Sequence, residues 1–156
     1  MILDSVLNSI TSLEMQHNVL LACNSLLKDN GTLILGTRSL GKATTTMKSK
    51  QATNRKRDIE FLDDEKFSVT FRNGVWTKQR FTTKKQLQQE LMPYFKDIET
   101  LGNETRSNIY AICKNPVRFS NEEYKKALNI EFNMTYPNGF KHNKHSELIN
   151  TILTNL

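Results

Sequence analysis

The sequence has few of the features that mark secreted, metal-binding or membrane proteins. Its only two cysteines, Cys23 and Cys113, are far apart and lie in apolar segments. This argues against a disulfide scaffold or a metal site and indicates core residues of a reduced, cytoplasmic protein. No apolar run approaches the roughly 18 residues of a membrane span, and the N-terminus lacks a signal peptide's basic region and cleavage pattern. We therefore expect no membrane partner.

Several catalytic and metal-binding motifs are also missing. There is no Gly-x-Ser-x-Gly sequence, and Gly41–Ala43 lacks the upstream glycine of a phosphate-binding loop. The acidic residues 63–65 are neighbours in a linker, so their side chains should point apart. We therefore favour a solvated surface over a cation-binding site for this run. His142 and His145 have no cysteine or carboxylate at metal-ligand spacing. We therefore predict no metal site.

Length and charge restrict the class of protein. The chain has 156 residues, which suits one domain around a single core. Its net charge is +6 and its isoelectric point is near 9.4. A basic excess favours an anionic partner such as nucleic acid, although an unspecific basic surface explains it equally well.

The first 38 residues predict a parallel βαβ unit. An apolar run from Ile2 to Leu7 predicts a strand covered on both faces. Thr11 and Glu14 form a capping-box pattern before a helix, and Asn30-Gly31 is a typical helix stop. A second apolar strand follows at 32–36. The helix face expected to pack on the sheet comprises Met15, Val19, Ala22, Cys23, Leu26 and Leu27.

A basic segment follows the second strand. Between positions 38 and 57 there is no acidic residue, and the basic residues are Arg38, Lys42, Lys48, Lys50, Arg55, Lys56 and Arg57. We predict a long flexible loop here. Loops of this length are usually functional or disordered, so both a solvated surface loop and an anion-binding or substrate-facing loop remain open.

Residues 67–81 predict an antiparallel hairpin. Apolar and polar residues alternate on both sides of Asn73-Gly74, the strongest short hairpin signal. Arg72, Lys78 and Arg80 are expected on its outward faces. Trp76, near the turn, suits either stacking on nucleic-acid bases or simple packing.

The rest of the chain predicts two strands and three helices. A helix opens at 82–85 and runs through Phe95, strands follow at 97–101 and 108–113, and helices follow at 121–131 and 146–154. The predicted fold class is therefore α/β. We divide it into a domain at 1–115, which carries a basic insertion at 38–82, and a C-terminal helical extension at 116–156.

The order of elements resembles the C-terminal half of a class I S-adenosylmethionine-dependent methyltransferase. That resemblance implies a partial Rossmann-like sheet made of the parallel βαβ unit, an inserted antiparallel hairpin and a terminal β-hairpin. The similar segments are Val6–Ile10 at the end of the family's fourth strand, Leu26–Gly31 at its Leu-Lys-Pro-Gly-Gly turn, Leu33–Arg38 at its fifth strand, Phe81–Leu87 at its last crossover, and Ile109–Ile112 in its final hairpin.

The resemblance lacks the family's cofactor site. In this family the cofactor lies on a glycine-rich loop after the first strand, where only glycine lets the backbone approach closely. No Gly-x-Gly occurs in the sequence. The resemblance therefore implies that S-adenosylmethionine binds only if a partner polypeptide supplies the missing half.

The resemblance places candidate catalytic residues after the fourth strand, at Asn8 and Ser9. The Pro-Pro pair of amino-methylating DNA enzymes and the Pro-Cys nucleophile of cytosine C5 enzymes are both absent there. Asn8 either orients a methyl acceptor or forms a turn. The candidate substrate-binding residues are Thr37, Arg38, Lys48, Lys50, Arg55, Lys56, Arg57, Trp76 and Arg80.

Two functions are consistent with these features. The first is a split or truncated methyltransferase half that is inactive alone and acts on or binds nucleic acid. The second is a non-catalytic binding or inhibitor module derived from such an enzyme, as a phage or mobile element would encode. In either case the edge of the first strand needs covering, which predicts a protein partner or a homodimer.

Overall fold

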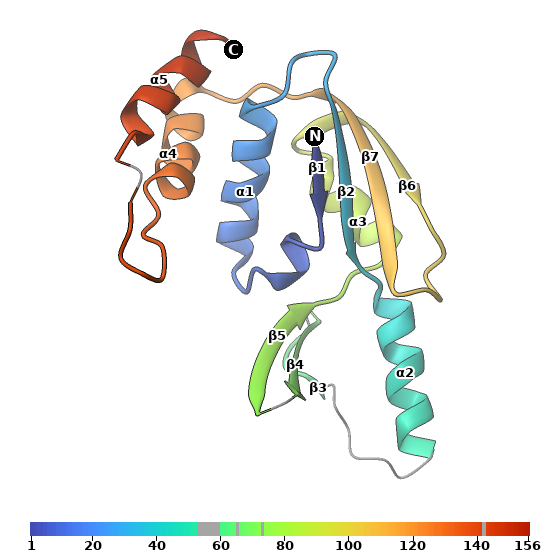
Figure 1. The fold of residues 1–156 in the computed structure, drawn as a ribbon. Coiled ribbons are helices and arrows are strands. Elements are labelled where there is room, and N and C mark those ends of the chain that lie inside the picture. Colours follow the sequence, from blue (N-terminus) through green and yellow to red (C-terminus); the bar gives the residue numbers. More distant parts are fainter. Residues whose placement is uncertain (53–59, 65, 73, 142) are drawn as a thin grey trace.

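The computed structural model describes residues 1–52, 60–64, 66–72, 74–141 and 143–156 (Figure 1). Four strands form a mixed sheet: β1 (Ile2–Asp4), β2 (Thr32–Arg38), β6 (Phe95–Leu101) and β7 (Asn108–Pro116). Their order is β1-β2-β7-β6. β1 is parallel to β2, and β7 is antiparallel to both of its neighbours, so β6 runs in the same direction as β1 and β2. The predicted α/β class is confirmed.

The N-terminal βαβ unit is confirmed, but its helix begins at a different cap from the one predicted. Helix α1 (Leu13–Ser25) connects β1 to β2. Its N-cap is Ser12, whose hydroxyl accepts a hydrogen bond from the Met15 N–H. The predicted cap at Thr11 is therefore wrong by one residue, because the backbone stays extended through Ser12 and brings its hydroxyl to the first turn.

β1 is shorter and more exposed than predicted. It ends at Asp4 because Ser5 takes a left-handed conformation (φ 58°) that turns the chain out of the sheet. Leu7–Ser9 then forms a short 3₁₀ helix, η1. Ile2 is 73% exposed, so the expectation of burial on both faces is wrong for this strand.

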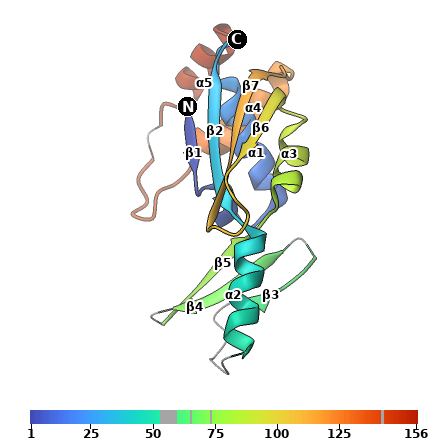
Figure 2. The same ribbon diagram turned by 90° about the vertical axis from the view of Figure 1, so that its right-hand side faces the viewer.

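Helices cover only one face of the four-stranded sheet. Leu33, Leu35 and Ile109 point to the covered face and are fully buried. Ile34 and Tyr110 alternate with them and remain 41% and 37% exposed on the other face. Figure 2 shows β1, β2, β7 and β6 in front of α1 and α4 (Asn121–Phe132), with none of the described elements drawn over them. α5 (His145–Thr154) packs against α4 on the far side.

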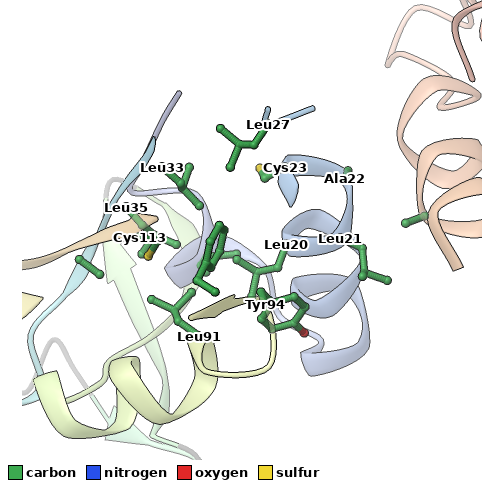
Figure 3. Packing of buried hydrophobic residues seen from close by; sticks show 14 of the residues in the cluster. Leu20, Leu21, Ala22, Cys23, Leu27, Leu33, Leu35, Leu91, Tyr94 and Cys113 are labelled. Atoms are coloured by element: carbon green, nitrogen blue, oxygen red, sulfur yellow. The ribbon is translucent and has the colours of Figure 1, made fainter. Parts of the chain in front are cut away.

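The core has three layers, with α1 in the middle. Figure 3 shows Leu20 and Cys23 on the side of α1 that faces Leu33, whereas Leu21 points to the opposite side. α4 packs against that opposite side, and its residues Tyr124, Ala127 and Leu128 belong to the same buried cluster. α1 is therefore apolar on two sides. The single predicted face misplaced Leu26, which is 47% exposed.

Both cysteines are buried and free, as predicted for core residues. Burial raises the pKa of Cys23 to about 11 and that of Cys113 to about 12. Both thiols therefore stay protonated at neutral pH.

The insertion begins with a helix where the sequence predicted a long loop. α2 (Leu40–Ala52) follows β2 directly, and Ser39 caps it by accepting a hydrogen bond from the Lys42 N–H (3.4 Å). The burial of Ala43 anchors its first turn. The loop prediction is thus wrong for 40–52, and its remainder at 53–57 lies outside the described residues.

The predicted hairpin at 67–81 is confirmed. β4 (Phe67–Arg72) pairs antiparallel with β5 (Val75–Arg80), and Gly74 adopts the positive φ (79°) that its turn requires. β3 (Glu60–Phe61) adds a third strand to this small sheet. Figure 1 shows α2 and these three strands projecting from one end of the main sheet.

The second half of the chain follows the prediction closely. α3 (Lys84–Leu91) starts at a capping box formed by Thr83 and Gln86 and packs against β6 and β7. It ends before Phe95, which instead begins β6 and is 1% exposed. Pro93 explains this earlier end, since proline stops the helix and lets Phe95 enter the sheet. None of the described helices is long and apolar enough to cross a membrane.

Candidate functional site

Three of the predicted site residues meet at one end of the main sheet, beyond the last residues of β1 and near the end of β2. Asn8 lies in η1 after β1, Thr37 lies near the end of β2, and Arg80 ends β5. They line a cavity of about 10 Å³, which is room for about one water molecule. We call these residues and their polar neighbours the inner cluster: Asn8, Gln16, Thr37, Arg80 and Glu90.

Arg80 points into the protein, which contradicts the predicted outward position. It is 8% exposed, its Nη2 donates to Glu90 Oε1 at 2.7 Å, and its Nη1 donates to Gln16 Oε1 at 3.2 Å. Burial along β5 does not alternate as predicted but increases from the exposed Val75 to the buried Arg80. The outward face of that strand turns toward α1 and α3 where β5 joins the main sheet, so Arg80 becomes a buried and paired charge.

Gln16 connects the inner cluster to η1. Its Nε2 donates to the carbonyl oxygens of Leu7 (3.1 Å) and Ile10 (3.0 Å), while its Oε1 accepts from Arg80. The amide therefore uses both donors and its acceptor. One network thus joins η1, α1, β5 and α3, and its evident role is to hold the insertion against the main domain.

The two candidate catalytic residues have different environments. Asn8 is 3% exposed; its Nδ2 donates to Ser9 Oγ at 3.3 Å, and its Oδ1 is buried without a hydrogen-bond partner among the described protein atoms. Buried polar atoms normally find a partner, and the small cavity beside Asn8 provides room for a bridging water. Ser9 is exposed, and its hydroxyl donates to the Ser5 carbonyl oxygen at 3.3 Å.

A larger groove of about 300 Å³ adjoins the inner cluster between α1 and α3. His17 Nδ1 and the Tyr94 hydroxyl share a hydrogen bond at its rim. Burial, and secondarily the charge of Glu90, raises the pKa of Tyr94 to about 12. Tyr94 therefore stays protonated at neutral pH. Neither residue was predicted as a site, and their separation of 77 positions gives no local signal.

A second, open site lies on the other side of the end of β2. Its lining residues come from the end of β2, the first turn of α2 and the connection into β7, and they border an open surface depression of about 640 Å³. We call this site the basic hollow: Arg38, Lys42, Thr105, Arg106, Ser107, Asn108 and Tyr110. Arg38 was predicted as a site residue. Lys42 and Arg106 were missed as site residues, because isolated surface cations carry no signal until the fold brings them together.

Of the remaining predicted substrate-binding residues, Lys48 and Trp76 have described side chains, and these line neither the inner cluster nor the basic hollow. Lys48 is exposed on α2, and Trp76 is 67% exposed on β5. Lys50 belongs to α2, but its side chain lies outside the described part of the chain, as do residues 55–57. These assignments therefore stay predictions.

No metal site appears within the described residues, in which no group of three histidine, cysteine, aspartate or glutamate side chains is suitably placed. Asp63 Oδ1 accepts a hydrogen bond from the Phe67 N–H (3.1 Å), and Asp64 lies 3.9 Å from Lys66 Nζ. These carboxylates thus have local structural partners. His145 begins α5, whereas His142 and Glu65 lie outside the described residues.

Comparison of the chain with models of protein families finds no match, and comparison with curated proteins finds no similar sequence.

Proposed function

We propose that residues 1–156 form the distal half of a class I S-adenosylmethionine-dependent methyltransferase-like sheet that acts on or binds nucleic acid. Strand order is the observation that carries this proposal. β1 and β2 are parallel neighbours joined by α1, β6 follows α3 in the same direction, and β7 returns antiparallel between β2 and β6. This is the order of fourth strand, helix, fifth strand, last crossover and final hairpin on which the resemblance rests.

The uncovered edge and face of the sheet support the idea that a further segment packs against them. Among the described strands β1 has a neighbour on one side only, and the exposed face carries Ile2, Ile34 and Tyr110. A free strand edge and a half-covered α/β sheet both favour association with a further segment. In this proposal a cofactor-binding half, outside residues 1–156, pairs with β1 and covers the part of the open face around Ile2 and Ile34, leaving Tyr110 at the other end of the face free.

The described residues do not fit S-adenosylmethionine by themselves. A side-chain carbon at Gly31, Gly36 or Gly41 would lie 2.8, 2.1 or 2.7 Å from another protein atom, so these glycines make room for the protein's own packing. These three glycines thus form no cradle for a cofactor. Residues 1–156 would supply the acceptor side, where methyl transfer depends mainly on alignment of the reactants.

The burial of Asn8 favours a second candidate, a non-catalytic binding or inhibitor module. In the resemblance the position after the fourth strand contacts the methyl acceptor. Here Asn8 is 3% exposed beside a cavity that admits about one water. The neighbouring coding sequence separates the two candidates, since a glycine-rich loop encoded beside this chain favours the enzyme.

Calorimetric titration with S-adenosylmethionine tests the division into halves. The 156-residue chain should show no binding heat at millimolar cofactor, because it lacks a glycine-rich loop. A saturable isotherm would contradict the argument that the cofactor site lies elsewhere.

Light scattering tests whether the β1 edge and the open face bind another chain. We expect the chain to self-associate or to form a heteromer through the β1 edge and the open face, and the variant Ile2→Lys/Ile34→Lys to abolish that association. Leu148→Lys serves as the control, since Leu148 is 44% exposed on α5, away from the open face. A clean monomer that stays monomeric with every candidate partner would overturn the expectation.

A further inference from the structure

The basic hollow gathers positive charge without neutralising it. Arg38, Lys42 and Arg106 line it, and none of its lining residues is acidic. Within the described part of the chain these three side chains make no ion pair; the ion pairs found there join other residues. Three cations around one hollow repel one another unless an anion is present. Their arrangement therefore points to an anionic ligand.

The walls of the hollow are fixed by hydrogen bonds. The Ser39 hydroxyl donates to the Glu104 carbonyl oxygen at 2.6 Å, and the Ser39 N–H donates to the Ser107 carbonyl oxygen at 3.0 Å. Gly41 lets the first turn of α2 lie against the same segment, because a side-chain carbon there would be 2.7 Å from the Glu104 oxygen. Lys42 and Arg106 are thus carried by two segments locked to each other.

Arg38 has donor capacity left over. Its Nη1 donates to Asn108 Oδ1 at 3.0 Å, which orients the guanidinium. Its Nε is buried and has no hydrogen-bond partner among the described atoms. An unpaired buried donor is costly, and a planar guanidinium matches two oxygens of a phosphate. With Asn108 as its hydrogen-bond partner in the fold, the Arg38 guanidinium keeps further donors for an anion in the hollow.

Two nearby carboxylates make their hydrogen bonds outside the hollow. Glu104 accepts a hydrogen bond from the Lys84 N–H at 2.6 Å, at the start of α3. Asp4 lies over Gly36 in the neighbouring strand, where its Oδ1 accepts from the Ser5 hydroxyl at 3.2 Å. Neither residue lines the hollow.

We propose that the basic hollow binds a backbone phosphate of a nucleic-acid strand, held by Arg38, Lys42 and Arg106. The assignment to nucleic acid, rather than to free phosphate, rests on the proposed function. The hollow is open to solvent, so a phosphate bound there can remain part of a longer strand. Tyr110 forms one wall and is 37% exposed, so its ring is available to stack on a base.

Fluorescence anisotropy with a labelled thymidine oligonucleotide of about 20 nucleotides, longer than a typical single-strand binding site, tests the hollow. Lys42→Gln/Arg106→Gln should weaken binding by about tenfold for each charge-assisted hydrogen bond to phosphate that is removed. It should also lower the slope of log affinity against log salt by about 0.7 for each cation removed. Arg38→Lys keeps the charge but not the planar fork, and should weaken binding without flattening the slope.

The matched control is Lys125→Gln/Lys126→Gln, which removes the same charge from exposed positions on α4. It should leave the affinity within about twofold and the slope nearly unchanged, because neither lysine lies at the hollow. Equal losses of affinity in both double variants would overturn the site in favour of unspecific attraction. So would an unchanged affinity in the hollow variant.

Inorganic phosphate separates the proposed nucleic-acid function from the proposal that the basic hollow binds a phosphate group. If the chain binds no oligonucleotide at low salt, the nucleic-acid function fails. Protection against thermal unfolding by millimolar phosphate, abolished in Lys42→Gln/Arg106→Gln and kept in the α4 control, would then retain the hollow as a site for a free phosphate group. Absence of both oligonucleotide binding and phosphate protection would overturn the hollow as well.

Discussion

Two arginines near the end of β2 have opposite environments. Arg80 is 8% exposed, bonded to Glu90 and Gln16, and borders a cavity with room for about one water. Arg38 lines an open hollow of about 640 Å³, has one amide partner in Asn108 and retains an unpaired Nε.

The comparison teaches that a charged residue near the end of β2 is not by itself evidence of a ligand-binding site. A buried cation whose donors meet a carboxylate and an amide serves the fold, because any ligand would have to displace those partners. A cation with spare donors and cationic neighbours contributes little to the stability of the fold and keeps its charge available to a ligand. Arg80 is therefore expected to determine stability, and Arg38 to determine binding.

The largest effect on stability is expected for Arg80→Met. The change leaves Glu90 and Gln16 without their partner and should destabilise the fold by about 2 kcal/mol, less than a fully buried pair because the Glu90 side chain is 35% exposed. Urea unfolding measures the change. The double variant Arg80→Met/Glu90→Leu should recover part of the stability, and a single variant as stable as the parent chain would refute the structural role of Arg80.

A smaller effect is expected for Ser39→Ala, which lies between the two sites. Ser39 is 1% exposed, caps α2 and bonds to the Glu104 carbonyl oxygen, so its removal should cost about 1 kcal/mol and weaken oligonucleotide binding several-fold. Thr45→Ala, which removes an exposed helix hydroxyl, is the control and should change neither quantity measurably. Full affinity in Ser39→Ala would show that the hollow does not depend on this hydrogen bond.

Alkaline pH probes the groove beside the inner cluster. The pKa of Tyr94 is raised from 10.0 to about 12, so its contribution to stability is complete below pH 10 and disappears as the pH rises toward 12. Tyr94→Phe should remove this part of the pH dependence. Spectrophotometric titration of tyrosinate in the parent chain and the variant measures the ionisation. The difference between the two titration curves is the ionisation of Tyr94. If its midpoint falls near the ordinary tyrosine pKa of about 10, the Tyr94 phenol is not buried as described.

The smallest effect on stability is expected for Arg38→Met. The change removes one part-buried hydrogen bond, to Asn108, and one unpaired buried donor, the Nε, whose effects on stability oppose each other. The free energy of unfolding should therefore change by less than about 0.5 kcal/mol, while oligonucleotide affinity falls about tenfold. Paired unfolding and anisotropy measurements on one preparation check this. Destabilisation as large as that of Arg80→Met would remove the distinction between the arginines.

Local patterns in the sequence predicted most of the fold. The Asn73-Gly74 turn, the alternation around it and the apolar periods of the later helices depend on neighbours in sequence, and those elements match closely. The errors come from conformations and contacts that such patterns do not contain: Ser5 ends β1 early, and α4 gives α1 a second apolar side.

The candidate sites were less predictable. Asn8, Thr37 and Arg80 were chosen separately and do meet, yet periodicity could not show that Arg80 turns inward to Glu90. The basic hollow depends on Arg106, which is distant from Arg38 in the sequence. Such a cluster exists only once β2 pairs with β7.

Nuclear magnetic resonance of the arginine Nε–H groups tests the central distinction most directly. A titration with the thymidine oligonucleotide should shift the Arg38 resonance in a saturable way and leave that of Arg80 unchanged, with each signal assigned by its Arg→Lys variant. A shift at Arg80 with none at Arg38 would contradict the account, because the ligand would then bind at the inner cluster and not in the basic hollow.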